Sequence, residues 1–131
     1  MNLTVAHNRF MKSERLCSKK HIDLLFKNGK SKWNNSLRVT WIFCDDEIEA
    51  PMQVLFLVPK KQFRRAVDRN LLKRRMREIY RLNKHDLFKK VNTDNKYLLI
   101  AFIYVGKTIE GYSVIESDLK KSLIKILKSL N

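Results

Sequence analysis

The segment from Ala66 to Lys84 has the pattern of an amphipathic helix, and it constrains the fold more than any other part of the chain. At about 100° per residue, one arc of this helix is apolar; it holds Val67, Leu71, Leu72, Met76, Ile79 and Leu82. The remaining arc of about 140° is polar and positive; it holds Arg69, Asn70, Lys73, Arg74, Arg77, Arg81 and Lys84. Arg75 and Glu78 fall on the apolar side. We therefore expect the helix to pack one side on a sheet, to expose the other, and to extend the Arg75 head group to water.

The positive charge of the chain is concentrated around this helix. Residues 60–90 contain 13 basic and 3 acidic residues, a surplus of 10 within a formal net charge of +15. An ordinary solvated helix interleaves glutamates for pairing one turn apart, and this face has almost none. Guanidinium groups bind phosphate through two parallel hydrogen bonds, and Asn70 adds hydrogen bonds to a base edge or a 2′-hydroxyl. The pattern predicts a nucleic-acid-binding face with salt-sensitive affinity, and leaves RNA or DNA open.

The chain also predicts a helix near each end. Ser18 is a suitable N-cap and Gly29 a suitable residue just past a helix end. Ile22, Leu25 and Phe26 recur between them at helical spacing. The last helix has a candidate Ser-x-x-Glu capping box at Ser113 and Glu116. Its apolar stripe consists of Ile115, Leu119, Leu123, Ile126, Leu127 and Leu130.

Three strands are predicted from alternating or apolar runs. Residues 36–44 alternate with β-branched and aromatic side chains, and residues 52–58 form a largely buried run. The acidic turn 45–51 joins them, so we expect a hairpin. Residues 96–104 form a third, nearly all-apolar strand, and residues 30–35 are compatible with a further short one. The order of elements predicts an α+β fold with helices covering one face of a sheet.

Length and composition predict one domain, residues 1–131, because 131 residues that are 44% hydrophobic suit a single core. Residues 1–15 show no period and are expected to form an extended basic arm. Cys17 and Cys44 have no Cys or His neighbours at metal-ligand spacing, so we expect two free thiols in a reducing compartment. The sequence has no run suited to a membrane span and no secretory signal. A cytoplasmic protein without a membrane partner is therefore expected.

A protein-only nuclease requires metal-binding carboxylates or a histidine acid–base pair. The three histidines lie in different segments and share no spacing; they are His7, His21 and His85. The one acidic group lies in the predicted turn, where a solvated loop explains it; it consists of Asp45, Asp46, Glu47 and Glu49. We expect no catalytic residue, no metal ligand and no small-molecule substrate in this protein.

The segment "RNLLKRRMRE" (69–78) has the pattern Arg-Asn-x-x-Lys-Arg-x-x-Arg-Glu. In this pattern the chain resembles the signature of a known family, the bacterial ribonuclease P protein subunit. The flanking segments are also similar, in the same order: "RLCSKKHIDLLFKNGKS" (15–31), "VLFLVPKKQFRRAVDRN" (54–70), "YLLIAF" and "SDLKKSLIKIL". The resemblance implies an α-β sandwich, ribosomal protein S5 domain 2-like. It implies the order helix-strand-strand-strand-helix-strand-helix and a left-handed crossover through the basic helix.

The resemblance also implies a function. The partners would be the RNase P catalytic RNA and precursor tRNA, whose 5′ leader is removed by Mg²⁺-dependent hydrolysis with the metal held mainly by RNA. The residues implied to bind the catalytic RNA are Arg69, Asn70, Lys73, Arg74, Arg77 and Arg81. The residues implied to line a cleft for the single-stranded leader are Ile22, Phe26, Thr40, Lys60 and Lys61.

This chain departs from the family pattern at four of the matched positions. Ile22 replaces a frequent phenylalanine and Thr40 an occasional tyrosine, which removes rings on which leader bases would stack. Phe63 and Leu55 replace frequent glycines, so close backbone approaches are expected to rearrange.

Two other classes remain open from the residues alone. A ribosomal or ribosome-assembly protein would share the charge and the α+β build. A helix-turn-helix DNA-binding protein requires a second helix three or four residues after the basic one, and we expect strand 96–104 there instead.

Overall fold

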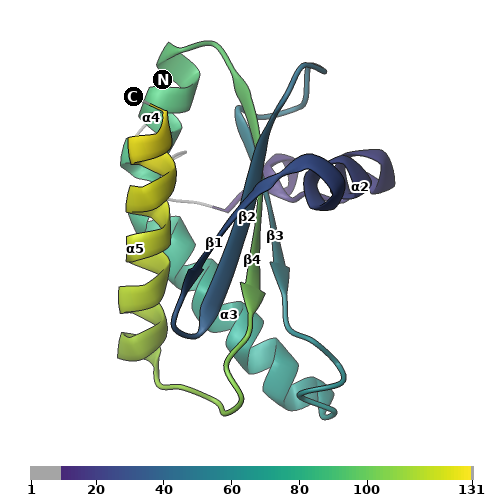
Figure 1. Ribbon diagram of the computed structural model, residues 1–131, viewed down its shortest axis with the longest axis vertical. Helices are drawn as coiled ribbons and strands as arrows, with labels where there is room; N and C mark the ends of the chain where they lie inside the picture. The colour runs from purple at the N-terminus through teal and green to yellow at the C-terminus, as the bar shows by residue number, and fades with distance from the viewer. Residues whose placement is uncertain (1–9, 131) are drawn as a thin grey trace.

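The computed structural model of the protein describes residues 10–130, which form a four-stranded sheet flanked by helices (Figure 1). In chain order the elements are η1 (Lys12–Glu14), α2 (Lys19–Asn28), β1 (Lys30–Asn34), β2 (Leu37–Cys44), β3 (Met52–Leu57), α3 (Ala66–Asn83), α4 (His85–Thr93), β4 (Tyr97–Tyr104) and α5 (Tyr112–Ser129). The strand order is β1-β2-β4-β3. β2 is antiparallel to both β1 and β4, whereas β3 runs parallel to β4.

The expected hairpin between β2 and β3 is wrong, because β4 lies between these strands. Leu98 to Phe102 of β4 are all buried. A strand whose side chains are apolar on both faces of the sheet is buried most completely at a central position, between two other strands. The hairpin is formed instead by β1 and β2, so the short strand at residues 30–35 is confirmed. Asn35 in its turn has φ of 51°, a left-handed conformation that asparagine tolerates.

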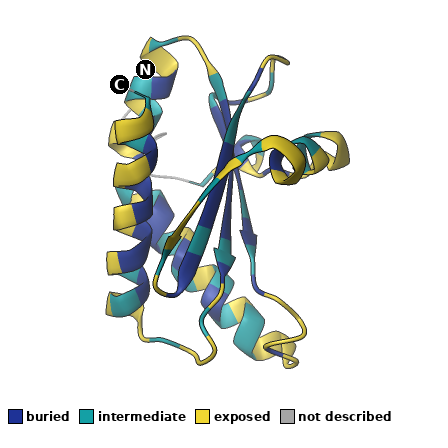
Figure 2. Cartoon of the chain, in the orientation of Figure 1, coloured by how far each residue is buried: buried dark blue, intermediate teal, exposed yellow. Residues whose placement is uncertain are grey.

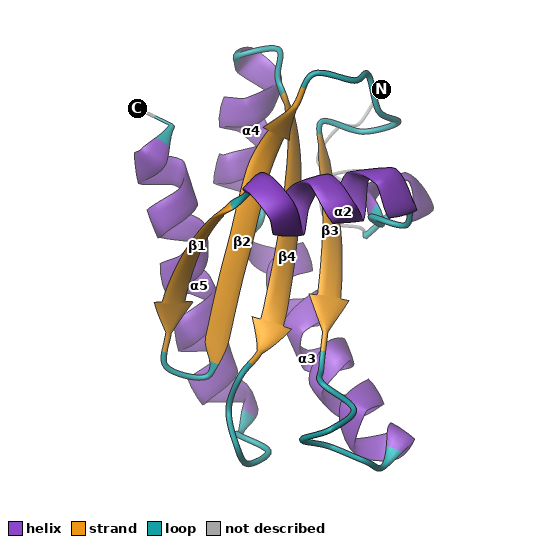
Figure 3. Cartoon of the chain, turned by 45° about the vertical axis from the view of Figure 1, so that its right-hand side comes forward, coloured by secondary structure: helices purple, strands orange, loops and turns teal. Residues whose placement is uncertain are grey.

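Helices cover both faces of the sheet, so the prediction of one covered face is also wrong. α3, α4 and α5 pack on one face, and Figure 2 shows that α3 and α5 turn their buried sides toward it. α2 crosses the opposite face (Figure 3) over a smaller core. That core consists of Leu16, Leu25, Cys44, Leu99 and Ala101. α2 has an apolar stripe of its own, and this stripe packs on the apolar residues that β4 presents on this face of the sheet.

The crossover from β3 to β4 through α3 and α4 is left-handed. Seen from the α2 side in Figure 3, β3 lies to the right of β4, both strands run downward, and α3 rises behind the sheet. This is the hand that the resemblance implies, and it is opposite to the general preference.

α4 is not predicted from the sequence; it follows α3 with Lys84 alone between them. Its buried Leu87 and Val91 pack into the larger core. The premise that a strand directly follows the basic helix is therefore wrong. A helix-turn-helix reading remains disfavoured on a different ground, because one residue replaces the turn of three or four.

Residues 10–15 pack against the body of the protein, so the expected extended arm is wrong for this part of it; residues 1–9 lie outside the described residues. The Phe10 ring contacts the rings of Phe56 and Tyr80 edge-on, with centroid distances of 5.7 and 6.0 Å. Glu14 forms an ion pair with Lys84, and both side chains are almost fully buried. The pKa of the neighbouring Tyr80 hydroxyl is raised, mainly by burial and to a smaller extent by the negative charge of Glu14. Lys84 is thus part of the core, and its predicted place on the solvent arc is wrong.

The ends of α2 follow the sequence prediction. The Ser18 hydroxyl accepts a hydrogen bond from the His21 backbone N–H at 3.3 Å, which confirms the N-cap. Gly29 ends the helix against β2. A Cβ at this position would lie 2.4 Å from the Leu25 carbonyl oxygen and 2.8 Å from Thr40 Cγ2, so only glycine fits without displacement.

The start of α5 differs from the predicted capping box. Gly111 is the N-cap, and its carbonyl already accepts from the Ile115 N–H at 3.2 Å, so Ser113 lies inside the first turn. The predicted stripe is confirmed: four of its residues are buried and the last two pack partly against the core. Within residues 10–130 no helix, α5 included, is long and apolar enough to cross a bilayer.

Candidate nucleic-acid interface

α3 turns one polar, positive side to solvent. Its opposite side is buried in the larger core through Leu72, Met76, Ile79 and Tyr80. Asn70, Lys73, Arg74 and Arg77 line a shallow surface hollow together with Val67 and Leu71. We call Asn70, Lys73, Arg74 and Arg77 the α3 basic face. Within residues 10–130, none of its three cations forms an ion pair with a carboxylate. Their charge is therefore available to an external anion.

The buried arc of α3 is narrower than the helical wheel predicts. Val67 is 67% exposed and Leu82 is 52% exposed. Val67 lies in the first turn, which extends past the ends of the strands (Figure 1). Arg75 lies on the apolar side as expected. Its guanidinium is not directed to water, because Nη1 donates to the Glu110 carbonyl at 2.6 Å.

Arg69 has a structural role that the sequence pattern does not reveal. Its Nη1 donates to the backbone carbonyls of Phe63 and Arg64, both at 2.8 Å. These bonds fasten the loop after β3 to the first turn of α3. Arg69 is half-buried beside the α3 basic face, and part of its hydrogen-bonding capacity serves the fold.

Arg81 is paired within its own helix. Its Nη2 and Nε donate to the Glu78 carboxylate at 2.6 and 3.1 Å. This hydrogen bonding lowers the pKa of Glu78 and raises that of Arg81. Glu78 therefore contacts the positive arc, contrary to its wheel position, and the charge of Arg81 is largely compensated.

The sheet face that carries α2 is left partly uncovered beyond that helix. One row of residues crosses all four strands there, because Trp33 pairs with Arg38, Arg38 with Ile103, and Ile103 with Leu57. We call this row the sheet platform. Trp33 is 59% exposed, and the Arg38 guanidinium carbon lies 5.1 Å from its ring centroid. Arg38 Nη2 also donates to the Ser31 hydroxyl at 3.2 Å. The platform thus offers an oriented ring and a cation.

The residues implied to line a leader cleft are not equally accessible. Phe26 is 38% exposed on α2, and Lys60 and Lys61 are exposed in the turn after β3. Ile22 is half-buried against the smaller core. Thr40 is 1% exposed, and its hydroxyl lies 2.9 Å from that of Ser31, so its expected place in a cleft wall is wrong.

Trp33 and Arg38 are not predicted as site residues from the sequence. The available signal was Trp33 itself, because a tryptophan in a short polar strand has no core to fill.

Phe63 and Leu55, which replace family glycines, both pack inward. Phe63 is 7% exposed with its ring 5.6 Å from that of Tyr104, and Leu55 packs partly against the smaller core.

The acidic turn is not simply solvated. The Asp46 carboxylate accepts hydrogen bonds from Lys20 Nζ at 3.0 Å and contacts His21 Nε2 at 3.1 Å. Both contacts lower the pKa of Asp46, and the hydrogen bond from Lys20 has the larger effect. His85 is exposed at the start of α4, and His7 lies outside the described residues. Cys44 is buried and Cys17 exposed, both as free thiols.

The chain is similar over most of its length to proteins of one family. The sequence model of the family described as Ribonuclease P matches residues 10–131. The "Ribonuclease P protein component" of Porphyromonas gingivalis is 40% identical over 115 residues, covering 88% of this chain and 84% of the relative. That of Chlorobium phaeobacteroides is 33% identical over 129 residues, covering 91% and 88%.

Solved structures agree in fold. The RNase P protein of Thermotoga maritima superposes with a TM-score of 0.66 at 26% identity, covering 86% of this chain and 96% of that one. The RNase P protein of Staphylococcus aureus gives a TM-score of 0.63 at 24% identity, covering 92% and 100%. The second likeness speaks for the fold alone.

Proposed function

The chain belongs to the ribonuclease P protein family, and on this premise we propose that it is a cytoplasmic accessory subunit that helps a catalytic RNA remove the 5′ leader of precursor tRNA. The observation that carries the proposal is the α3 basic face, a family-signature segment whose cations have no carboxylate partner within residues 10–130. A ribosomal protein would share the charge, but it would not need this signature.

The α3 basic face binds the catalytic RNA in this proposal. Arg74 and Arg77 can each grip a phosphate through two hydrogen bonds, and Lys73 adds a point charge. Asn70 supplies a donor and an acceptor for a base edge or a 2′-hydroxyl. Arg69 contributes mainly by holding the preceding loop, and Arg81 contributes less than its charge suggests because Glu78 compensates it.

The leader lies across the sheet platform and the exposed edge of α2. Single-stranded RNA binds where rings can stack on bases and cations can neutralise phosphates. Phe26 and Trp33 supply the exposed rings, and Arg38, Lys60 and Lys61 supply the charges. Trp33 on β1 thereby supplies an aromatic ring in place of those that this chain lacks at Ile22 and Thr40.

The protein residues do not suit the Mg²⁺ ion that the reaction requires. Within residues 10–130, the one group of three potential ligands consists of His21, Cys44 and Asp46. Magnesium prefers an octahedron of oxygens, so a thiol and an imidazole exclude it. The proposal therefore assigns the catalytic Mg²⁺ to the RNA subunit and the substrate, and assigns positioning and charge neutralisation to the protein.

Reconstitution tests this function. Purified protein, the host's candidate catalytic RNA and a precursor tRNA are combined with Mg²⁺ at near-physiological salt, and each component is omitted in turn. Cleavage at the mature 5′ end is expected when RNA and protein are both present, and no cleavage with the protein alone. Cleavage by RNase-free protein alone, or no effect of protein on the RNA reaction, contradicts the proposal.

A further inference from the structure

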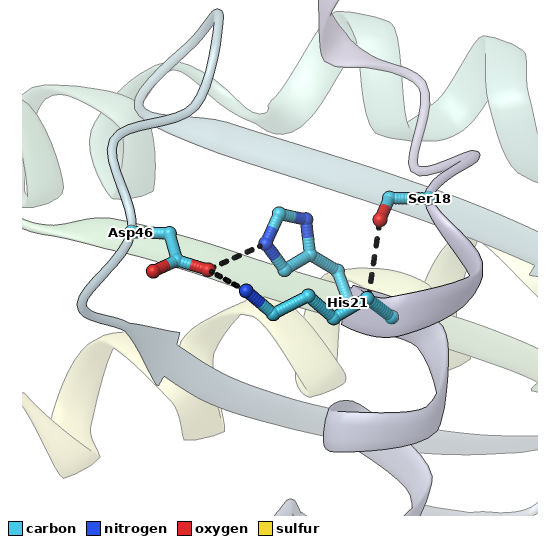
Figure 4. Close-up of polar contacts among 4 residues, drawn as sticks. Ser18, His21 and Asp46 are labelled. Atoms are coloured by element: carbon cyan, nitrogen blue, oxygen red, sulfur yellow. Dashed lines mark hydrogen bonds and ion pairs between the residues drawn. The ribbon is translucent and has the colours of Figure 1, made fainter.

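Three side chains of different chemistry meet where α2 crosses the end of β2. They are His21 from the first turn of α2, Cys44 from the last position of β2, and Asp46 from the following loop. Figure 4 shows the His21 ring turned toward the Asp46 carboxylate. One ligand atom of each, an imidazole nitrogen, the thiol sulfur and a carboxylate oxygen, lies within 4.8 Å of the other two. Sequence spacing does not reveal the cluster, because His21 is more than twenty residues from the other two.

The separations are close to those of a tetrahedral metal site. Bonds of about 2.0–2.1 Å to nitrogen and oxygen and about 2.3 Å to sulfur place the ligand atoms roughly 3.3–3.6 Å apart. His21 Nε2 and Asp46 Oδ2 are already 3.1 Å apart. The distances to the sulfur therefore have to shorten by at most about 1.5 Å, a change shared between the half-exposed Asp46 side chain and Cys44.

Two features of the surroundings support an ion. Cys44 is buried in the smaller core, and the Ser18 hydroxyl accepts from the His21 backbone N–H, so the elements that carry these two ligands are held by the fold. A surface pocket beside His21 gives access from solvent. Two carboxylates and two cations line this pocket, so its charge is balanced; they are Glu47, Glu49, Lys12 and Arg15.

One group competes with a metal. Lys20 Nζ lies 3.0 Å from the same Asp46 oxygen, but its side chain is 77% exposed. A mobile surface ammonium of this kind contributes little and can move to water. The contact shows that the Asp46 carboxylate attracts cations, and it predicts that removing Lys20 strengthens metal binding.

We propose that His21, Cys44 and Asp46 bind a divalent transition-metal ion that accepts sulfur, of which Zn²⁺ is the natural example. A thiolate, an imidazole and a carboxylate form a mixed set that suits Zn²⁺ or Co²⁺ and excludes Mg²⁺ and Ca²⁺. Binding displaces the thiol proton. The ion ties α2 to the end of β2 and thereby fixes the helix that carries Phe26. This site does not depend on the proposed function.

Cobalt titration of reduced, tag-free, full-length protein tests the proposal, because a thiolate–Co²⁺ bond gives a charge-transfer band and tetrahedral Co²⁺ gives strong visible bands. We expect one Co²⁺ per chain, displaced by Zn²⁺, and a Zn²⁺-dependent rise in Tm. Cys44→Ser should abolish the charge-transfer band and the rise in Tm. His21→Gln and Asp46→Asn should weaken binding by at least about tenfold, the effect known even for residues that only support a ligand.

The matched control is Cys17→Ser, which changes the exposed thiol and should leave the titration unaltered. Lys20→Ala should tighten binding. Circular dichroism verifies that each variant is folded, and the exposed Asp46→Asn carries the test if Cys44→Ser is not. The proposal is overturned by a wild-type protein without the thiolate band, or by a band that survives Cys44→Ser in folded protein. It is also overturned if folded Asp46→Asn binds Co²⁺ as tightly as the wild type, or if the band requires Cys17.

Discussion

Replacing Trp33 by alanine should reduce recognition of the leader without affecting assembly with the catalytic RNA. The ring is 59% exposed, and the Arg38 guanidinium lies 5.1 Å from its centroid, so one ring face remains for a base. Stacking on an aromatic side chain is worth about 1–3 kcal/mol per base. With one face available we expect a loss of about 1–2 kcal/mol, or roughly 5- to 30-fold in Kd.

The assay compares holoenzyme binding constants for a precursor tRNA and the mature tRNA at one salt concentration. Trp33→Ala should lower the precursor-to-mature preference, Phe26→Ala should lower it similarly, and Trp33→Phe should retain most of it. Ile124→Ala is the matched control, since Ile124 is 50% exposed on α5 at the other face of the sheet. An unchanged preference in Trp33→Ala, with normal catalytic-RNA affinity, would refute the role of the sheet platform.

Arg77→Ala should weaken catalytic-RNA binding by about 1–3 kcal/mol and reduce the slope of log affinity against log salt concentration by about one. Arg69→Ala should in addition lower the midpoint of urea unfolding, because Arg69 holds the loop before α3. Equal urea midpoints for the two variants would contradict these loop contacts. Lys84→Met leaves Glu14 buried without its partner and should cost about 3–5 kcal/mol in urea unfolding, whereas adding Glu14→Gln should restore much of that stability. A single-variant loss below about 1 kcal/mol would mean that water reaches the pair. Gly29→Ala should destabilise by about 1–3 kcal/mol in the same assay, because its Cβ has no room against the Leu25 carbonyl; unchanged stability would show that the end of α2 can shift. Ile22→Phe should raise the precursor-to-mature preference by up to about 1–2 kcal/mol, and no change would place the leader away from α2.

Features set by neighbouring residues were predictable from the sequence. The α3 helix, the Ser18 cap and the α5 stripe depend on hydrogen bonds and spacings within one or two turns, and each lies where the pattern places it. The family signature likewise lies within one helix, so resemblance identified it without a structure. The Ser113 capping box shows the limit of such patterns, because the helix begins two residues earlier, where the Gly111 carbonyl accepts from the Ile115 N–H.

The candidate site was predicted only in part, and the errors have a common cause. A helical wheel predicts only the direction in which each side chain points. Whether that side chain is buried depends on which other element packs against that side of the helix. Lys84 points into the core because Glu14, seventy residues away, offers a charge there. Thr40 is hidden because α2 ends on it through Gly29. Trp33 is exposed because α2 stops short of its row.

The sequence by itself determined most of the segments that become helices and strands, α4 excepted, where the positive charge concentrates and to which family the residues are similar. Periodicity, capping and composition act over a few residues, so they are present in the chain before it folds. The tertiary structure alone decided the strand order, the second covered face, the Glu14–Lys84 pair, the sheet platform and the meeting of His21 with Cys44 and Asp46. Each of these joins residues far apart in sequence, and such contacts arise from the competition of apolar surfaces for burial across the whole chain.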